Sequence, residues 1–250
     1  MLDLKFRDKF ALKFQHMVGW ITFPVWGGIL IVLMRVVGRY RVPELRAIRQ
    51  KYKEVKQATC GPVIVCSNHL TKIDSAILNW SLASVWSYMK SFKFFSWNLP
   101  ERANFYHSAF LKTVCYLGSC IPIDRGGNRE AVRKSLDKVI YLLKKGHTVT
   151  VFPEGGRSRT GRVDAEGFTY GVGKLVNKVK DCTVLCVYLR GHNQETYSEI
   201  PRKGARFYLD MKLIKPTSDH SGLRATRDLA AQIIGQLTQM EQVYFATSRQ

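Results

Sequence analysis

Short apolar runs alternate with longer helical patterns along most of this chain, and this alternation constrains its fold more than any other feature. Five runs have the length and composition of strands: Val63–Cys66, Cys120–Ile123, Thr148–Phe152, Thr183–Leu189 and Ala205–Ile214. A closing helix is expected over Gly222–Val243, where apolar residues recur in near-helical register. Strands interleaved with helices indicate an α/β fold. We therefore expect one domain with a central, mostly parallel sheet flanked by helices.

The composition changes twice before this domain begins. Residues 1–41 are basic and apolar, residues 42–60 have a basic amphipathic pattern, and residues 61–250 hold the α/β domain, which starts at Gly61-Pro62. We expect the first part to be a membrane-associated helical hairpin or anchor and the second to be a single helix. The chain is long enough to fold on its own apolar core without disulfides.

The first part contains an uncharged segment, Phe14–Met34, of 21 residues. As a helix it would reach about 30 Å, enough to span a bilayer. Pro24 and the pair Gly27-Gly28 lie near its middle, and basic residues flank both ends. These features favour a bent helical hairpin that dips into the membrane and returns. A spanning anchor and a buried core helix are the alternatives.

The second part predicts a helix over Val42–Gln57 with Pro43 in its first turn. One face is apolar, and the other carries five cations: Arg46, Arg49, Lys51, Lys53 and Lys56. This basic face is either an ordinary solvated surface or a surface that lies on anionic lipid headgroups.

The charge balance indicates the kind of partner. The chain has 39 Lys and Arg residues against 19 Asp and Glu, a net charge of +20, while 46% of its residues are apolar. The apolar content excludes a disordered chain, and the charge favours polyanions, anionic lipids or phosphate-bearing substrates. The six cysteines have no C-x-x-C spacing, so we expect no metal site and a reducing, cytoplasmic environment.

A histidine and an aspartate follow the first strand-like run. His69 lies in the expected turn between strand and helix, and Asp74 stands near the start of the helix. A carboxylate at this spacing can hold one imidazole nitrogen and leave the other free to take a proton from a hydroxyl. The alternative is that Asp74 only caps the helix.

A glycine-rich turn leaves the run Thr148–Phe152. It combines glycines, which let backbone N–H groups approach an anion, with an arginine fork suited to phosphate, in the order Glu154, Gly155, Gly156, Arg157, Ser158. A polar loop with incidental charge is the alternative. Another strand-like run ends in Asp124-Arg125, where Arg125 is either a partner of Asp124 or a further anion ligand.

These motifs occur in the order N-H-x-x-x-x-D, I-P-I-D-R and F-P-E-G-G-R-S, and they resemble those of the glycerolipid acyltransferase family, typified by bacterial 1-acylglycerol-3-phosphate acyltransferases. The resemblance covers Pro62 to about Leu189. It implies that His69 is the general base and that Asp74 orients it. It assigns the acceptor phosphate to Arg125, Glu154, Gly155, Arg157 and Ser158. Gly156 departs from the family, which commonly has Thr there, and Lys90 and Lys93 match only loosely a second phosphate contact.

The resemblance implies a membrane-bound O-acyltransferase of phospholipid biosynthesis on the cytoplasmic face of the cell membrane. It would move a fatty acyl group from acyl-CoA or acyl carrier protein to the hydroxyl of a lysophospholipid, most simply 1-acylglycerol-3-phosphate, without a metal or further cofactor. Another lysolipid, such as lyso-ornithine lipid, is an alternative acceptor. A basic nucleic-acid-binding protein is the alternative of another class, although the sequence has no recognisable nucleic-acid motif and nucleic acid is not an expected partner.

Overall fold

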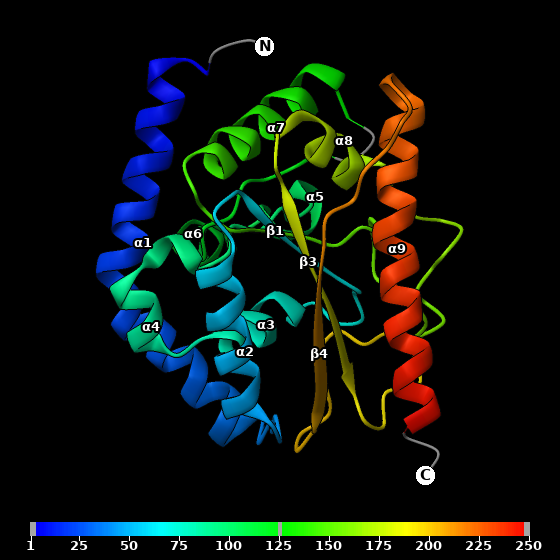
Figure 1. Ribbon diagram of the computed structural model, residues 1–250. Helices are drawn as coiled ribbons and strands as arrows, with labels where there is room; N and C mark the ends of the chain where they lie inside the picture. Colours follow the sequence, from blue (N-terminus) through cyan, green and yellow to red (C-terminus); the bar gives the residue numbers. More distant parts are fainter. Residues whose placement is uncertain (1–3, 125–126, 248–250) are drawn as a thin grey trace.

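The computed structural model describes residues 4–124 and 127–247, and its centre is a four-stranded sheet in the order β2-β1-β3-β4 (Figure 1). The strands are β1 (Val63–Ser67), β2 (Val149–Val151), β3 (Thr183–Gly191) and β4 (Phe207–Ile214). β1 pairs in parallel with β2 and β3, whereas β4 is antiparallel to β3. The expected α/β fold with a mostly parallel central sheet is therefore confirmed.

One expected strand is absent from this sheet. The run Cys120–Ile123 is extended, but it forms only isolated parallel bridges, from Cys120 to Asn98 and from Ile123 to Glu101. Its neighbour Trp97 forms a similar bridge with Val149 of β2. The run still bonds to the facing segment, because the Ile121 N–H donates to the Asn98 carbonyl and the Ile123 N–H to the Pro100 carbonyl. Pro100 has no N–H to donate back to Ile121, which interrupts the ladder.

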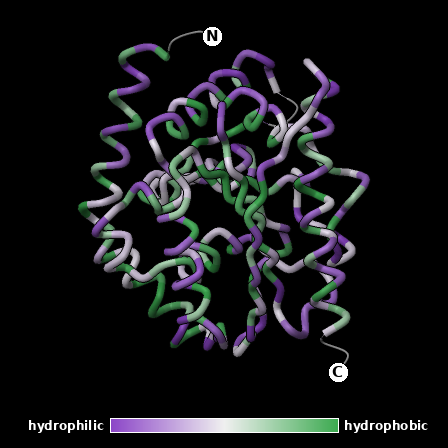
Figure 2. Tube along the Cα trace, viewed as in Figure 1, coloured by the Kyte–Doolittle hydropathy of each residue, from purple (hydrophilic) through white to green (hydrophobic). Residues whose placement is uncertain are grey.

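Helices cover both faces of the sheet. Their bounds are α1 (Phe6–Val32), continued by the π-helical turn η1 (Leu33–Val37), α2 (Leu45–Ala58), α3 (Asp74–Leu82), α4 (Val85–Lys90), η2 (Phe92–Phe94, a 3₁₀ turn), α5 (Arg102–Phe105), α6 (Ala109–Leu117), α7 (Arg129–Lys144), α8 (Gly171–Lys178) and α9 (Gly222–Thr247). Apolar residues concentrate around the strands between these layers (Figure 2).

Alternate residues of the central strands enter two different cores. Ile64 of β1 and Cys186 of β3 pack with apolar residues of α7, α8 and α9. Val65 and Leu185 pack on the other side, with apolar residues of α1, α2, α3 and α4. Because both faces of these strands are covered, β1 and β3 are buried along their whole length, which explains their unbroken apolar sequence.

The N-terminal segment is one long helix and not a hairpin. Helical structure runs from Phe6 to Val37 through Pro24, so the expected hairpin is wrong. The glycine at position 27 makes no reversal. It gives room to the ring of Phe23, since a Cβ atom on Gly27 would come within 2.7 Å of that ring.

One side of this helix packs on the domain, and the other is exposed and apolar. Buried residues recur at helical spacing on the inner side, at Leu12, Gln15, Gly19, Phe23 and Gly27. Only 22% of its most apolar window is buried, which contradicts a core helix, while its length and composition suffice to cross a membrane. α4 and α6 pack against α1 and add further exposed apolar side chains. We call the exposed side of α1 together with Trp86, Phe110 and Val114 the apolar face.

The packing of α8 on α9 predicts opposite effects for two glycine substitutions. A Cβ atom on Gly173 would lie 1.9 Å from the backbone oxygen of Thr226, whereas one on Gly235 would meet nothing within 4 Å. We expect Gly173→Ala to destabilise the fold by about 1–3 kcal/mol through overpacking. Gly235→Ala should instead stabilise it by about 0.5–1 kcal/mol, because alanine favours a helix interior.

Denaturant unfolding of the two variants and the wild type, measured in the same detergent, checks both signs. A Gly173→Ala protein as stable as the wild type would show that α8 and α9 are not packed as described.

Candidate active site

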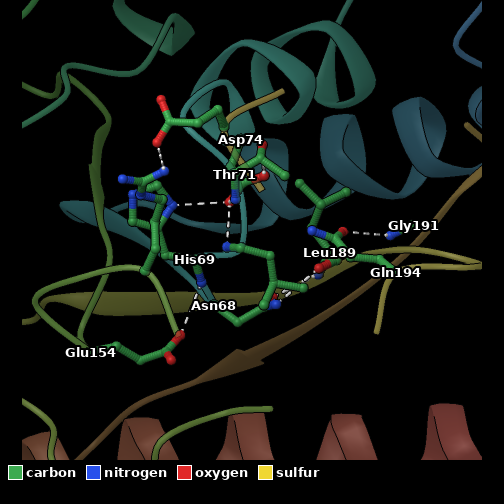
Figure 3. Close-up of polar contacts among 11 residues, drawn as sticks. Asn68, His69, Thr71, Asp74, Glu154, Leu189, Gly191 and Gln194 are labelled. Atoms are coloured by element: carbon green, nitrogen blue, oxygen red, sulfur yellow. Dashed lines mark hydrogen bonds and ion pairs between the residues drawn. The ribbon is translucent and has the colours of Figure 1, made fainter. Parts of the chain in front are cut away.

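The carboxylate of Asp74 organises the turn that follows β1. Its Oδ2 atom accepts backbone hydrogen bonds from Leu70 (2.7 Å) and Thr71 (2.8 Å) and lies 2.9 Å from Nδ1 of His69. Its Oδ1 atom accepts the hydroxyl of Thr71 at 2.6 Å. Asp74 is also the first residue of α3 and is almost fully buried. It therefore holds the turn that precedes the helix and contacts the imidazole at the same time (Figure 3).

This contact leaves the second ring nitrogen of His69 available. The imidazole stacks on the ring of Phe152, with centroids 4.1 Å apart and planes 20° from parallel. The side chain is 19% exposed, so a substrate hydroxyl can reach it. With Nδ1 facing a carboxylate, Nε2 carries the lone pair that general-base chemistry requires.

Asn68 fixes the backbone just before His69. Its Nδ2 atom donates to the carbonyl of Leu189 at 2.9 Å, and its Oδ1 atom accepts the Leu189 N–H at 2.8 Å. The side chain thus continues the pairing of β1 with β3 by one more position after β1 has ended, as Figure 3 shows. Asn68 belongs to the motif, but no pattern in the sequence indicates this role.

Glu154 connects the glycine-rich turn to the backbone of His69. Its Oε1 atom accepts the His69 N–H at 2.9 Å and its Oε2 atom accepts the Asp164 N–H at 3.3 Å. Burial raises the pKa of this carboxyl to about 7. Glu154 therefore occupies a different position from the one expected of a phosphate ligand, because its oxygens already accept backbone hydrogen bonds and a carboxylate repels phosphate.

Gly155 and Ser158 also hold the turn together. Gly155 has a φ of +71°, and a Cβ atom there would lie 2.2 Å from the Thr169 methyl group, so only glycine fits. Ser158 donates its backbone N–H to the His69 carbonyl at 2.9 Å. Its buried hydroxyl donates to the Arg162 carbonyl. Both residues thus help to pack the turn against its surroundings.

The structure places Arg157 beside an open hollow at the glycine-rich turn. This hollow has a volume of about 300 Å³ and is lined by Gly156, Arg157, Arg159 and Tyr197. The Arg157 guanidinium donates to Oε1 of Glu199 at 2.7 Å and lies over the Tyr197 ring. Two arginines at an open hollow form a site suited to an anion.

Glu199, which the sequence analysis does not single out, pairs with two cations near the site. It accepts from Arg157 and forms a second ion pair with Lys72, three residues after His69. These hydrogen bonds lower the pKa of its carboxyl. Because Glu199 lies far from His69 in the sequence, no local pattern could have identified it.

The remaining expected contacts are Arg125, Lys90 and Lys93. Arg125 falls outside the described residues, and its neighbour Asp124 pairs with Arg102 at 2.9 Å. Lys90 lines a different hollow, and the carbonyl of Lys93 accepts the N–H of Thr148, just before β2. Both lysines thus lie toward the start of β2, whereas His69 follows the other end of its parallel neighbour β1.

The buried carboxyl of Glu154 predicts a pH-dependent stability. Its pKa is about 7 in the folded protein against a usual value of 4.5, so the folded state holds the proton more tightly. The resulting stabilisation of the folded state is fully present below the usual pKa of 4.5 and is lost as the pH rises through about 7.

Between about pH 5 and pH 8 we therefore expect the free energy of unfolding of the wild type to fall by up to about 3 kcal/mol relative to that of Glu154→Gln, because glutamine does not titrate. Unfolding free energies of both proteins across this range measure the difference. Parallel pH profiles would refute the assignment.

A family model described as Acyltransferase matches residues 47–190, more than half of the chain. Among solved structures, the chain is similar to the 1-acyl-sn-glycerophosphate acyltransferase PlsC from Thermotoga maritima, with 15% sequence identity, a TM-score of 0.46, and coverage of 94% of this chain and 98% of that one. A search of curated proteins found no match. The extent of the family match shows that the chain belongs to the Acyltransferase family.

Proposed function

We propose that this chain transfers a fatty acyl group from an acyl thioester to the free hydroxyl of a lysophospholipid, with 1-acylglycerol-3-phosphate as acceptor and phosphatidic acid as product. Family membership gives the reaction class. The observation that supports the mechanism is the 2.9 Å contact between His69 Nδ1 and Asp74, which leaves Nε2 of His69 free. The donor is acyl-CoA or acyl carrier protein, and no further cofactor takes part.

The chemistry follows from this arrangement. Nε2 of His69 removes the proton of the acceptor hydroxyl while that oxygen attacks the thioester carbonyl. The tetrahedral intermediate then collapses, the new ester bond remains, and the carbon–sulfur bond breaks. The imidazolium, stabilised by Asp74, returns the proton to the departing thiolate. One hydroxyl proton thus moves to the thiol, and His69 is restored.

The hollow beside Arg157 is the proposed site of the acceptor phosphate. The Glu199 carboxylate now pairs with Arg157 and Lys72, and a phosphate, with more charge and more acceptor oxygens, would replace it. Arg125 is proposed as a second ligand. Glu154, Gly155 and Ser158 contribute by holding the turn that carries Arg157.

Membrane association is part of the proposal. The apolar face along α1, α4 and α6 is suited to contact with lipid on the cytoplasmic side of the membrane, where the positive charge of the chain would be attracted to anionic headgroups. A lysophospholipid would then enter the active site from the bilayer without passing through water.

Substitution of the two central residues tests the mechanism. We expect His69→Ala to abolish acyl transfer because the base is removed, and Asp74→Asn to reduce kcat by up to about 10⁴-fold because the imidazole tautomer is no longer fixed. The assay measures product formation from acyl-CoA with lysophosphatidic acid, lysophosphatidylcholine or lyso-ornithine lipid as acceptor.

His220→Ala, at an exposed histidine remote from this turn in the sequence, serves as the matched control. Circular dichroism and thermal unfolding establish that each variant is folded. Full activity of a folded His69→Ala protein would exclude the mechanism, and a preference for another acceptor would exclude 1-acylglycerol-3-phosphate alone.

Arg157→Lys tests the phosphate contact. Lysine keeps the charge but cannot form the two-pronged guanidinium contact, so kcat/KM for a phosphate-bearing acceptor should fall roughly ten- to a hundredfold. Thioester hydrolysis without acceptor should change little. Glu199→Gln removes the competing carboxylate and should lower KM for the same acceptor. Equal losses of transfer and hydrolysis in Arg157→Lys would place this arginine at the donor or in the fold.

A further inference from the structure

The basic side of α2 faces an open hollow that is separate from the active site. This hollow has a volume of about 510 Å³ and lies between α2, the end of α3 and α4. Its cationic side chains are Arg46, Arg49, Lys53, Lys56 and Lys90. None of the described residues that line it is Asp or Glu. Its charge is therefore positive and is not neutralised locally.

The spacing along α2 explains which cations reach the hollow. Positions 46, 49, 53 and 56 recur every three or four residues and so share one side of the helix. Lys51 lies outside this pattern and pairs with Asp210 of β4 at 3.1 Å. The five basic residues expected on one face of this helix therefore have two different surroundings. Lys51 forms an ion pair with β4, and the other four line the hollow.

Two of these cations are partly buried and have no ionic partner among residues 4–124 and 127–247. Arg49 donates from Nη2 to the Trp80 carbonyl at 2.8 Å, but its Nε atom is buried without a hydrogen-bond partner. Lys56 contacts the Thr148 hydroxyl at 3.2 Å and the ring of Phe94, and burial lowers its pKa to about 8. Within the described ranges, no carboxylate pairs with any of the five cations. A bound anion would give these two side chains an ionic partner.

The hollow lies too far from His69 to belong to the catalytic centre. α3 begins at Asp74, beside His69, and ends at Leu82, which lines the hollow. Its nine residues extend over about 12 Å. Lys56, moreover, contacts Thr148 at the start of β2, whereas His69 follows the end of the parallel neighbour β1. The two sites are therefore at opposite ends of the sheet.

The position of α4 identifies the source of the anion. α4 contributes Ser87 and Lys90 to the hollow and also carries Trp86, which is 78% exposed and belongs to the apolar face. Trp86 and Lys90 are four residues apart and so lie on the same side of this helix. Tryptophan at a membrane surface lies at the level of the headgroups. If Trp86 rests there, Lys90 and the hollow are at the depth of the lipid phosphates.

We propose that this hollow is a second, non-catalytic site that binds the headgroup phosphate of an anionic membrane lipid. The cations of α2 and Lys90 hold the phosphate oxygens, while Trp86 and the adjoining apolar face contact the acyl region. Binding at this position would fix the orientation of the protein on the membrane surface. The proposal concerns lipid binding and does not depend on the acyl acceptor.

Vesicle binding without substrates tests the site. The experiment compares co-sedimentation of Lys53→Gln/Lys90→Gln and Lys51→Gln/Lys178→Gln with phosphatidylcholine vesicles that contain or lack phosphatidylglycerol. Both variants remove two exposed positive charges, but only the first alters the hollow. We expect the gain in binding from phosphatidylglycerol to fall about tenfold or more in the first variant and less than about threefold in the control.

Equal losses of vesicle binding in the two variants would overturn the proposal, because general attraction to the anionic surface would then be enough to explain the binding. A second measurement separates lipid from soluble phosphate. At constant ionic strength, glycerol 3-phosphate should not raise the unfolding temperature of the wild type more than that of Lys53→Gln/Lys90→Gln. A larger rise in the wild type would assign the hollow to a soluble phosphate compound. Neither measurement depends on catalytic activity, so failure here leaves the proposed function standing.

Discussion

The buried carboxylate of Asp74 is the interaction on which the site depends. It accepts two backbone N–H groups and a hydroxyl, starts α3, and contacts the imidazole of His69. From the other side, Glu154 accepts the His69 N–H and Ser158 donates to its carbonyl. His69 is thus held at its ring, its N–H and its carbonyl, so the position of its second ring nitrogen is fixed before substrate arrives.

Much of this arrangement could be predicted from sequence because it is local. β1 and β3 are buried on both faces, so their sequences are apolar runs. His69 and Asp74 are only five residues apart. The function of Glu154 could not be predicted, because the sequence pattern of a carboxylate beside glycines is the same whether the carboxylate faces a ligand or accepts hydrogen bonds from backbone N–H groups. The hairpin expectation is wrong because Pro24 and the pair Gly27-Gly28 resemble a helix break in sequence, whereas the helix continues through Pro24 and Gly27 accommodates the Phe23 ring.

The charge of +20 is distributed between sites with different surroundings. Arg157 and Lys72 are paired with Glu199, so anion binding at the active site exchanges one ion pair for another. The cations between α2 and α4 have no such partner in the part of the chain that the structure describes, and an anion there would add a contact without breaking one. This contrast suits a reversible substrate site and a more persistent membrane contact, respectively.

The protonation state of the His69 ring gives the most direct test of the central claim. Nitrogen-15 NMR of protein labelled in histidine, recorded above the pH range in which an imidazole normally titrates, distinguishes the two neutral tautomers. If Asp74 fixes the ring as described, the His69 signals will show a protonated Nδ1 and an unprotonated Nε2, and the Asp74→Asn protein will lose this preference. A neutral His69 protonated at Nε2 in the wild type would contradict the account, because that nitrogen could not then accept the hydroxyl proton.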